Sequence, residues 1–148
     1  MRAKISSELP ASAEQVWSLV KRSSTLLYVT RGLLGFGGAD QFPSEWRQGA
    51  QVDTRLLFFG VLPAWRHRLT FKVVSDAKRE QFTEEGGGLV PTWNHLIKVE
   101  ALGAQQCRYT DDVEIKAGPL TPVVWLYANV FYRYRQWRWR SLLRQGGA

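Results

Sequence analysis

The chain has 148 residues, 45% hydrophobic and 22% charged, which predicts a single domain over residues 1–148 and excludes wholesale disorder. Its one cysteine, Cys107, excludes an intramolecular disulfide and a cysteine-based metal site, and it fits a reducing cytoplasm. The net charge of +7 is concentrated near the C-terminus, because residues 117–148 contain five arginines and no acidic residue. With no signal-peptide pattern and no apolar run of ~20 residues, we expect a soluble cytoplasmic protein.

The N-terminal residues predict a strand followed by two short helices. Residues 2–9 form the expected strand. Ser12, with Gln15 three residues later, is a capping-box pattern that marks the start of a helix. A second helix is expected from about residue 24 to residue 29. The glycine-rich segment 32–38 lacks the Gly-Lys-Ser/Thr of a phosphate-binding loop, so we expect a mobile flap or a plain connector there.

Residues 51–116 alternate between apolar and other side chains, which is the period of a strand with one buried face. The alternation is clearest in residues 65–73, 93–99 and 109–115. Turn-forming residues separate the runs at 60–63, 75–78, 86–88 and 103–105. The pattern predicts a meander of antiparallel hairpins.

A long helix is expected from about Leu120 to Arg144, after the Gly118-Pro119 pair. At 1.5 Å per residue it would be ~37 Å long, enough to cross the whole sheet. On a helical wheel one arc, roughly 100° wide, is mainly apolar and is predicted to face the sheet. Its members are Leu120, Val123, Val124, Tyr127, Phe131, Tyr134 and Leu142.

Four stretches carry a family resemblance in their order along the chain, namely Ile5–Trp17, Thr92–His95, Tyr109–Ile115 and Phe131–Arg135. They resemble the START-like/Bet v 1-like superfamily, whose bacterial members are known as SRPBCC or polyketide cyclase/dehydrase-like proteins. The resemblance implies an α+β helix-grip fold, in which a curved antiparallel sheet of six to seven strands surrounds the long C-terminal helix and leaves a cavity. Members bind lipids, sterols, plant hormones or polyketides, and some are cyclases or aromatases.

Both histidines follow a tryptophan by two residues, since Trp65 precedes His67 and Trp93 precedes His95. Each histidine falls on the apolar face of a predicted strand. Burial favours the neutral imidazole, which suits a proton acceptor or a group that orients a ligand. A core histidine bonded to a neighbouring side chain is the alternative for each.

The position of Asp111 depends on the register of the last hairpin. If Leu102 pairs with Gln106, Ile97 lies opposite Asp111 and His95 becomes its diagonal neighbour, within about 7 Å between Cβ atoms. The carboxylate would then orient the imidazole, as in acid–base catalysis. The same contact would satisfy a buried aspartate in a protein without turnover. A slip by one residue would turn Asp111 outward.

Arg138 falls within the predicted inward arc of the long helix. A guanidinium cannot discharge, so a buried one needs an anion. The anion would be Asp111 or another acidic residue of the sheet, or else a carboxylate or phosphate on the ligand.

The other side of the predicted helix combines a basic stripe with an aromatic one. The two stripes consist of Arg133, Arg140 and Arg144, and of Trp125, Tyr132 and Trp139. Such a surface suits an anionic membrane or a protein partner, unless loops cover the aromatic rings. Nucleic acid is disfavoured, because the arginines lie on a packed helix and no nucleic-acid-binding motif is present.

The leading hypothesis is binding or transport of a small hydrophobic ligand, lipid-like or aromatic, in an internal cavity. Its expected contacts are Trp65, His67, Leu69, Phe71, Trp93, His95, Ile97, Tyr109, Asp111, Val113, Tyr127, Phe131, Tyr134 and Arg138. One alternative is a cyclase, aromatase or dehydratase that uses His95 and Asp111. The other is a membrane or protein interaction through the last helix. No metal site is expected, because the two histidines lie on strands ~9.6 Å apart. No cofactor is expected either.

Overall fold

The computed structural model describes residues 1–146, so the last two residues of the expected 1–148 domain lie outside it. The strands of its sheet are β1 (Arg2–Leu9), β2 (Leu34–Gly37), β3 (Gln51–Phe58), β4 (Leu62–Ser75), β5 (Glu80–Gly87), β6 (Val90–Gly103) and β7 (Gln106–Lys116). The helices are α1 (Ala13–Val20), α2 (Ser23–Thr30) and α3 (Thr121–Arg144), with short 3-10 helices at Ala39–Gln41 and Gly118–Leu120. None of the helices described is long and apolar enough to cross a membrane.

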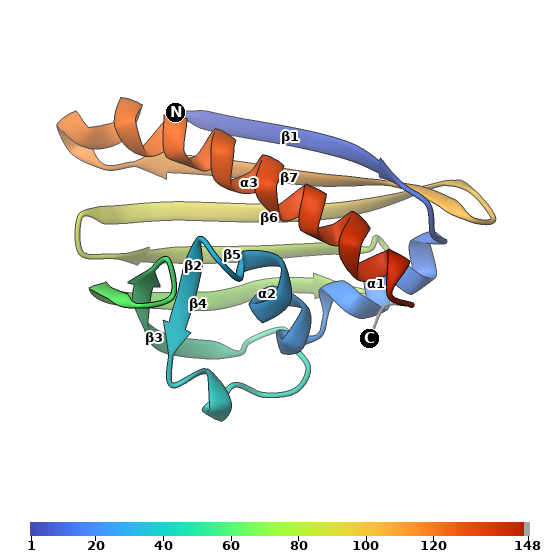
Figure 1. The fold of residues 1–148 in the computed structure, drawn as a ribbon, viewed down its shortest axis with the longest axis horizontal. Coiled ribbons are helices and arrows are strands. Elements are labelled where there is room, and N and C mark those ends of the chain that lie inside the picture. Colours follow the sequence, from blue (N-terminus) through green and yellow to red (C-terminus); the bar gives the residue numbers. More distant parts are fainter. Residues whose placement is uncertain (147–148) are drawn as a thin grey trace.

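The strands form one antiparallel seven-stranded sheet in the order β1-β7-β6-β5-β4-β3-β2. The first strand, β1, therefore pairs with the last, β7, and the remaining strands follow from β7 to β2 as an antiparallel meander. Figure 1 shows the sheet curling around α3, which crosses it alongside β1 and β7, while α1 and α2 lie toward the C-terminal end of α3. This arrangement confirms the predicted α+β helix-grip fold.

The capping box predicts the start of α1 correctly. The Ser12 side chain accepts a hydrogen bond from the backbone N–H of Gln15 (3.1 Å), which satisfies one of the free donors at the helix N-terminus. Val16 and Trp17 are buried on the inner face of α1. The indole N–H of Trp17 donates to Asp76 (2.8 Å), which ties α1 to the turn between β4 and β5.

The register of β6 and β7 places His95 as expected. Ile97 pairs with Asp111, and His95 pairs with Val113. The expected pairing of Leu102 with Gln106 is wrong, because Gly103 takes that place across a β-bulge. The bulge absorbs one residue next to the turn, so the register beyond it is unchanged.

The glycine-rich segment 32–38 is not only a connector. Leu34–Gly37 form the edge strand β2, which pairs with β3 from Leu34 opposite Phe58 to Gly37 opposite Arg55. The missing side chain of Gly35 permits the close approach, since a Cβ there would lie 3.1 Å from the Cα of Gly60. The expectation of a flap fails because the backbone groups of this segment complete the sheet.

The buried face of α3 is rotated by roughly a quarter turn from the predicted arc, at 100° per residue. Its buried side chains are Ala128, Phe131, Tyr132, Arg135, Gln136, Trp139 and Leu142. Val123 is 67% exposed and Leu120 is 41% exposed. The helical wheel did not predict this rotation because Arg135 and Gln136, which lie within the buried face, are polar. Gln136 lies inside because its amide donates to the carbonyl of Ile5 (2.7 Å) and to Asp111 (3.1 Å).

Candidate ligand-binding cavity

A cavity of about 300 Å³ lies between α3, α2 and the concave face of the sheet. Its walls are mainly apolar and aromatic, and they come from every strand except β1. The wall residues on the helices and the loop before β3 are Val20, Thr25, Leu26, Val29, Thr30, Trp46, Val123, Val124, Tyr127, Phe131, Tyr132, Arg135 and Trp139. Those on the strands are Leu34, Phe36, Leu56, Phe58, Trp65, His67, Leu69, Phe71, Gln81, Thr83, Glu85, Val90, Trp93, His95, Ile97 and Tyr109. The volume is at the lower end of the range for small-molecule sites.

Most of the residues predicted from the sequence line this cavity, including both histidines. They are Trp65, His67, Leu69, Phe71, Trp93, His95, Ile97, Tyr109, Tyr127 and Phe131. Strand alternation explains this placement, because residues two apart on β4 and on β6 share one face.

The other four predicted contacts lie outside the cavity wall. Asp111 is fully buried behind His95, and Val113 belongs to the core cluster that also contains Phe131. The hydroxyl of Tyr134 donates to the backbone carbonyl of Arg31. These residues face the interior, which places a residue in the core without placing it beside the cavity.

Arg138 is the fourth, and its guanidinium does not point inward. It donates two hydrogen bonds to the backbone carbonyl of Tyr28 (3.0 and 3.2 Å). It also lies 4.1 Å from the centre of the Tyr28 ring, in a cation–π contact. The rotation of α3 turns Arg138 toward α2 and brings Arg135 into the cavity instead.

The aromatic stripe predicted for the outer face of α3 is wrong for the same reason. Trp139 and Tyr132 are each 1% exposed, and both line the cavity. The indole of Trp125 donates to the backbone carbonyl of Arg2 (2.8 Å) at the margin of the helix. Trp137, which is 56% exposed, faces outward there.

His95 and Asp111 form a buried pair, with 2.7 Å between Nε2 and Oδ1. Asp111 also accepts hydrogen bonds from the Tyr109 hydroxyl (3.1 Å) and from Gln136 (3.1 Å). Burial by itself raises the pKa of Asp111. The hydrogen bond from His95 and the positive charge of Arg135 outweigh burial, so the pKa lies below its usual value. The carboxylate only accepts, so Nε2 of His95 carries the proton.

His67 forms a second pair of the same kind with Glu85, a partner that was not predicted from the sequence. Nε2 of His67 is 3.2 Å from Oε1 of Glu85, and the Thr83 hydroxyl donates to the other carboxylate oxygen. Burial by itself raises the pKa of Glu85, but the hydrogen bond and charge of His67 outweigh it and the pKa is lowered. The missed signal was the polar alternation of Gln81, Thr83 and Glu85 along β5, all of which line the cavity.

Arg135 is the one arginine among the cavity-lining residues described. It is 6% exposed, and its guanidinium makes no hydrogen bond or ion pair with any residue from 1 to 146. It lies over aromatic rings instead, 5.1 Å from the centre of Tyr132 and 5.8 Å from that of Phe131. Burial by itself lowers the pKa of Arg135, but the surrounding acidic groups, with Asp111 the strongest of them, together outweigh burial and keep the pKa above its usual value.

Unpaired buried polar atoms gather around this cavity. Five such atoms have no hydrogen-bond partner in the described chain, and each belongs to a residue of the cavity wall. They are Nε1 of Trp65, Nδ1 of His67, Oε1 of Gln81, Nε of Arg135 and Nε1 of Trp139. Proteins leave few buried polar atoms unpaired. The concentration of these five atoms around one cavity therefore indicates that the mainly apolar wall offers free donors and acceptors to a polar group.

The carboxylates and imidazoles form two separate pairs rather than one cluster. No group of three or more His, Cys, Asp or Glu side chains within residues 1–146 is arranged to hold a metal ion. His67 lies on β4 and His95 lies on β6, with β5 between them. Each imidazole therefore has its own acidic partner. The polar groups of the cavity can orient a ligand or move a proton.

A protein family described as a domain of unknown function, DUF8410, matches residues 7–145. The chain belongs to this family. No curated protein is significantly similar to it in sequence. The DUF8410 match covers both histidine–carboxylate pairs and the whole of α3, so the cavity lies within the family domain.

Solved structures share the fold of this DUF8410 chain at low sequence identity. A START superfamily protein from Mycobacterium smegmatis is 15% identical with a TM-score of 0.73, covering 97% of each chain. A conserved protein from Geobacillus kaustophilus is 12% identical with a TM-score of 0.71, covering 98% of this chain and 96% of that one. Norcoclaurine synthase from Thalictrum flavum, in complex with dopamine and hydroxybenzaldehyde, is 15% identical with a TM-score of 0.56, covering 89% and 84%. These likenesses show a START/Bet v 1-like fold.

Proposed function

We propose that the protein binds a small hydrophobic molecule in the cavity between α3 and the sheet. The observation that carries the proposal is the cavity itself, about 300 Å³ in volume and lined chiefly by apolar and aromatic side chains. Proteins of START/Bet v 1-like fold typically bind hydrophobic ligands. The norcoclaurine synthase structure, which has that fold, holds two aromatic molecules.

The chemistry of the wall supports an apolar ligand with one or two polar groups. Apolar surface transferred from water to such a wall contributes about 25 cal/mol per Å². Phe131 stacks on Tyr127, with 5.6 Å between ring centres, and presents a flat surface to a ligand ring or chain. The His67–Glu85 and His95–Asp111 pairs add polar groups that fix the orientation of the ligand.

A cavity-filling variant tests the proposal. Leu56 is 6% exposed and lines the cavity from β3, so Leu56→Trp would occupy ligand space. Leu126→Trp, on the outer face of α3 where Leu126 is 61% exposed, is the matched control. The uncharged fluorophore N-phenyl-1-naphthylamine should bind the parent protein and Leu126→Trp with bright emission, and Leu56→Trp weakly. Equal binding to all three, or to none, would refute the proposal.

Native mass spectrometry of protein purified from its own host provides a test without a chosen probe. A co-purifying small molecule, released on denaturation and reduced in Leu56→Trp, is the expected result. A molecule retained at equal level in Leu56→Trp would lie elsewhere on the protein.

An acid–base enzyme of the cyclase, aromatase or dehydratase type is a second candidate function. The 2.7 Å contact between His95 and Asp111 favours it, because an oriented imidazole beside a cavity is the arrangement of a general base. In that case His95→Gln retains the co-purified molecule, while the parent protein converts it on incubation. A molecule that stays unchanged with the parent protein would exclude this function and leave simple binding.

Attachment to an anionic membrane is a third candidate, favoured by the outer face of α3. Val123, Val130 and Trp137 stand one heptad apart and are each more than half exposed, which gives an apolar stripe. Arg133, Arg140 and Arg144 are exposed on the same helix. Salt-sensitive binding to phosphatidylserine vesicles should disappear when these three arginines become glutamine. Vesicle binding that is unchanged when the three arginines are replaced would exclude attachment to an anionic membrane through this face.

A further inference from the structure

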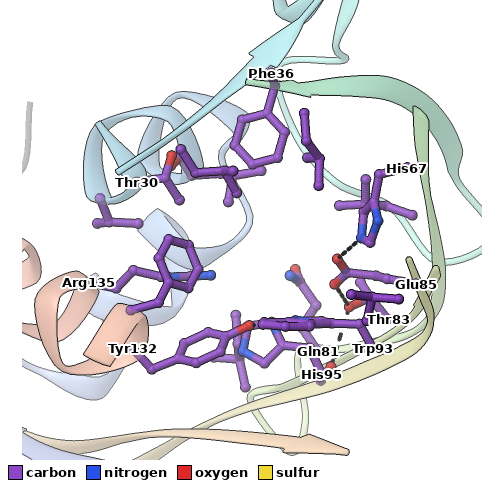
Figure 2. Close-up of a pocket in the computed structure, with 18 of the residues that line it drawn as sticks. Thr30, Phe36, His67, Gln81, Thr83, Glu85, Trp93, His95, Tyr132 and Arg135 are labelled. Carbon is purple, nitrogen blue, oxygen red and sulfur yellow. Dashed lines mark hydrogen bonds and ion pairs between the residues drawn. The ribbon is translucent and has the colours of Figure 1, made fainter. Parts of the chain in front are cut away.

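We infer that the bound molecule carries an oxyanion, such as a carboxylate, and that the guanidinium of Arg135 binds it inside the cavity. This inference rests on the proposed function, since it names the chemical class of the same ligand. Figure 2 shows Arg135 reaching from α3 into the cavity, opposite the wall from which His67 and Glu85 project. The ligand would be an apolar body with a single anionic head.

The first support is the state of Arg135 itself. The side chain is 94% buried, and no residue in the described chain accepts a hydrogen bond from it. A guanidinium has five N–H donors and stays charged under all ordinary conditions, so a buried one is costly unless its donors meet an anion. Its contacts with the rings of Phe131 and Tyr132 hold the group in place without using its donors.

The second support is that the nearby carboxylates are already engaged. Asp111 accepts hydrogen bonds from His95, Tyr109 and Gln136, and no ion pair within 4.0 Å joins it to Arg135. Glu85 accepts from His67 and Thr83. The negative charges of Asp111 and Glu85 stabilise the charged guanidinium of Arg135 at a distance. Neither carboxylate accepts a hydrogen bond from that guanidinium.

The third support is the fit between guanidinium and oxyanion geometry. A carboxylate accepts two parallel hydrogen bonds from one guanidinium, which strengthens the contact and fixes its direction. Beside Arg135 the wall presents the rings of Phe131 and Tyr132, and Trp93 lies 6.1 Å from Tyr132 between ring centres. An anion bound there would place the apolar part of the ligand against those rings.

The inference differs from a purely structural role for Arg135. In a structural role the positive charge offsets Asp111 and Glu85, and a ligand gains nothing from being anionic. In the proposed role an anionic ligand binds more tightly than an uncharged molecule of the same shape. Matched pairs of probes separate the two.

The test uses two such pairs with the parent protein. The aromatic pair is 8-anilinonaphthalene-1-sulfonate and N-phenyl-1-naphthylamine, which share a ring system and differ by the sulfonate. The aliphatic pair is dodecanoate and dodecanol, measured by displacement of the fluorophore. We expect the anionic member of at least one pair to bind about tenfold or more tightly, as a charged hydrogen bond in a dry site would give. A preference in the aromatic pair would indicate an aromatic ligand, and a preference in the aliphatic pair would indicate an aliphatic one.

Variants then assign the preference to Arg135. Arg135→Gln should remove the preference for the anion and leave the uncharged probe bound, whereas Arg135→Lys should retain part of it. Arg22→Gln is the matched control, because Arg22 is exposed, lies outside the cavity wall and loses the same charge. It should bind both probes as the parent does.

The outcomes distinguish the inference from the function on which it rests. Equal binding of charged and uncharged probes by the parent protein overturns the inference and leaves the proposed function standing. Equal weakening of both probes in a folded Arg135→Gln also overturns it. Binding of neither probe by the parent removes the proposed function and the inference together. If Arg135→Gln fails to fold, the comparison of probes with the parent protein and Arg135→Lys still decides.

Discussion

His95 and Asp111 are diagonal neighbours across β6 and β7, and their side chains meet at 2.7 Å between Nε2 and Oδ1. His67 and Glu85 repeat this relationship across β4 and β5, where Glu85 pairs directly with Leu69, two residues beyond His67. Strand register therefore gives each imidazole one carboxylate. Both imidazoles line the cavity between the sheet and α3.

Replacing Asp111 with asparagine should lower the free energy of unfolding by about 3 kcal/mol, because it removes a fully buried charge whose hydrogen bonds come from three residues. The folded-state pKa of Asp111 is lowered, so its stabilisation is complete above the unfolded pKa of about 4 and disappears as pH falls through the folded pKa. Urea unfolding between pH 2 and pH 7 checks this.

The control for that variant is Asp112→Asn on the same strand. Asp112 pairs with Arg2 at 2.7 Å, but the Arg2 side chain is 58% exposed, so solvent screens the interaction. We expect a clearly smaller loss from Asp112→Asn. An equal loss of unfolding free energy in both variants would mean that the buried carboxylate does not contribute as argued. The same conclusion would follow if Asp111→Asn lost stability at low pH just as the parent protein does.

The sequence predicted the sheet better than the face of the long helix. Alternation along β4 and β6 is a period of two, which an error of a few residues at an end does not change. The register that places His95 beside Asp111 is as predicted, although Leu102 does not pair with Gln106, because the β-bulge is confined to the end of the hairpin. In the helix α3, by contrast, Arg135 and Gln136 are buried, and the groups that favour their burial lie on the strands of the sheet.

The missed Glu85 shows the same limit. Polar residues at Gln81, Thr83 and Glu85 alternate as well as apolar ones do, but a search for apolar faces passes over them. Only the structure shows that His67 and His95 flank this row on neighbouring strands and make its burial favourable. Polar partners across strands come from tertiary pairing, which one strand alone does not encode.

Truncating Phe131 should weaken both the fold and ligand binding. Phe131 is 3% exposed, stacks on Tyr127 and contacts Tyr132 edge to face at 5.2 Å between ring centres. Phe131→Ala should therefore cost about 3 kcal/mol in the free energy of unfolding. It should also weaken N-phenyl-1-naphthylamine severalfold. Tyr127→Ala is the control, since Tyr127 is 37% exposed and should lose less stability; a larger loss from Tyr127→Ala would contradict the packing described.

Gly88 should not tolerate a side chain, because the Trp65 indole occupies the space. A Cβ at Gly88 would lie 2.3 Å from Cγ of Trp65, and the residue has a φ of +51°. Gly88→Ala should lower Tm by several degrees and shift tryptophan emission as Trp65 moves within the cavity wall. Gly60→Ala is the matched control in another turn, since Gly60 also has a positive φ (+79°) and no atom lies within 4 Å of a Cβ there. Similar Tm values for the two variants would rule out the clash.

The thiol of Cys107 should be inert in the folded protein. Cys107 is 0% exposed on β7, and burial raises its pKa to about 11, so the reactive thiolate is scarce at neutral pH. Reaction with 5,5′-dithiobis-(2-nitrobenzoate) at pH 8 should therefore proceed only through opening of the fold, and it should slow further when a ligand fills the cavity. Asp111→Asn should react faster than Asp112→Asn, in proportion to its lost stability. Labelling of the native protein at the rate of a free thiol would show that β7 opens without global unfolding.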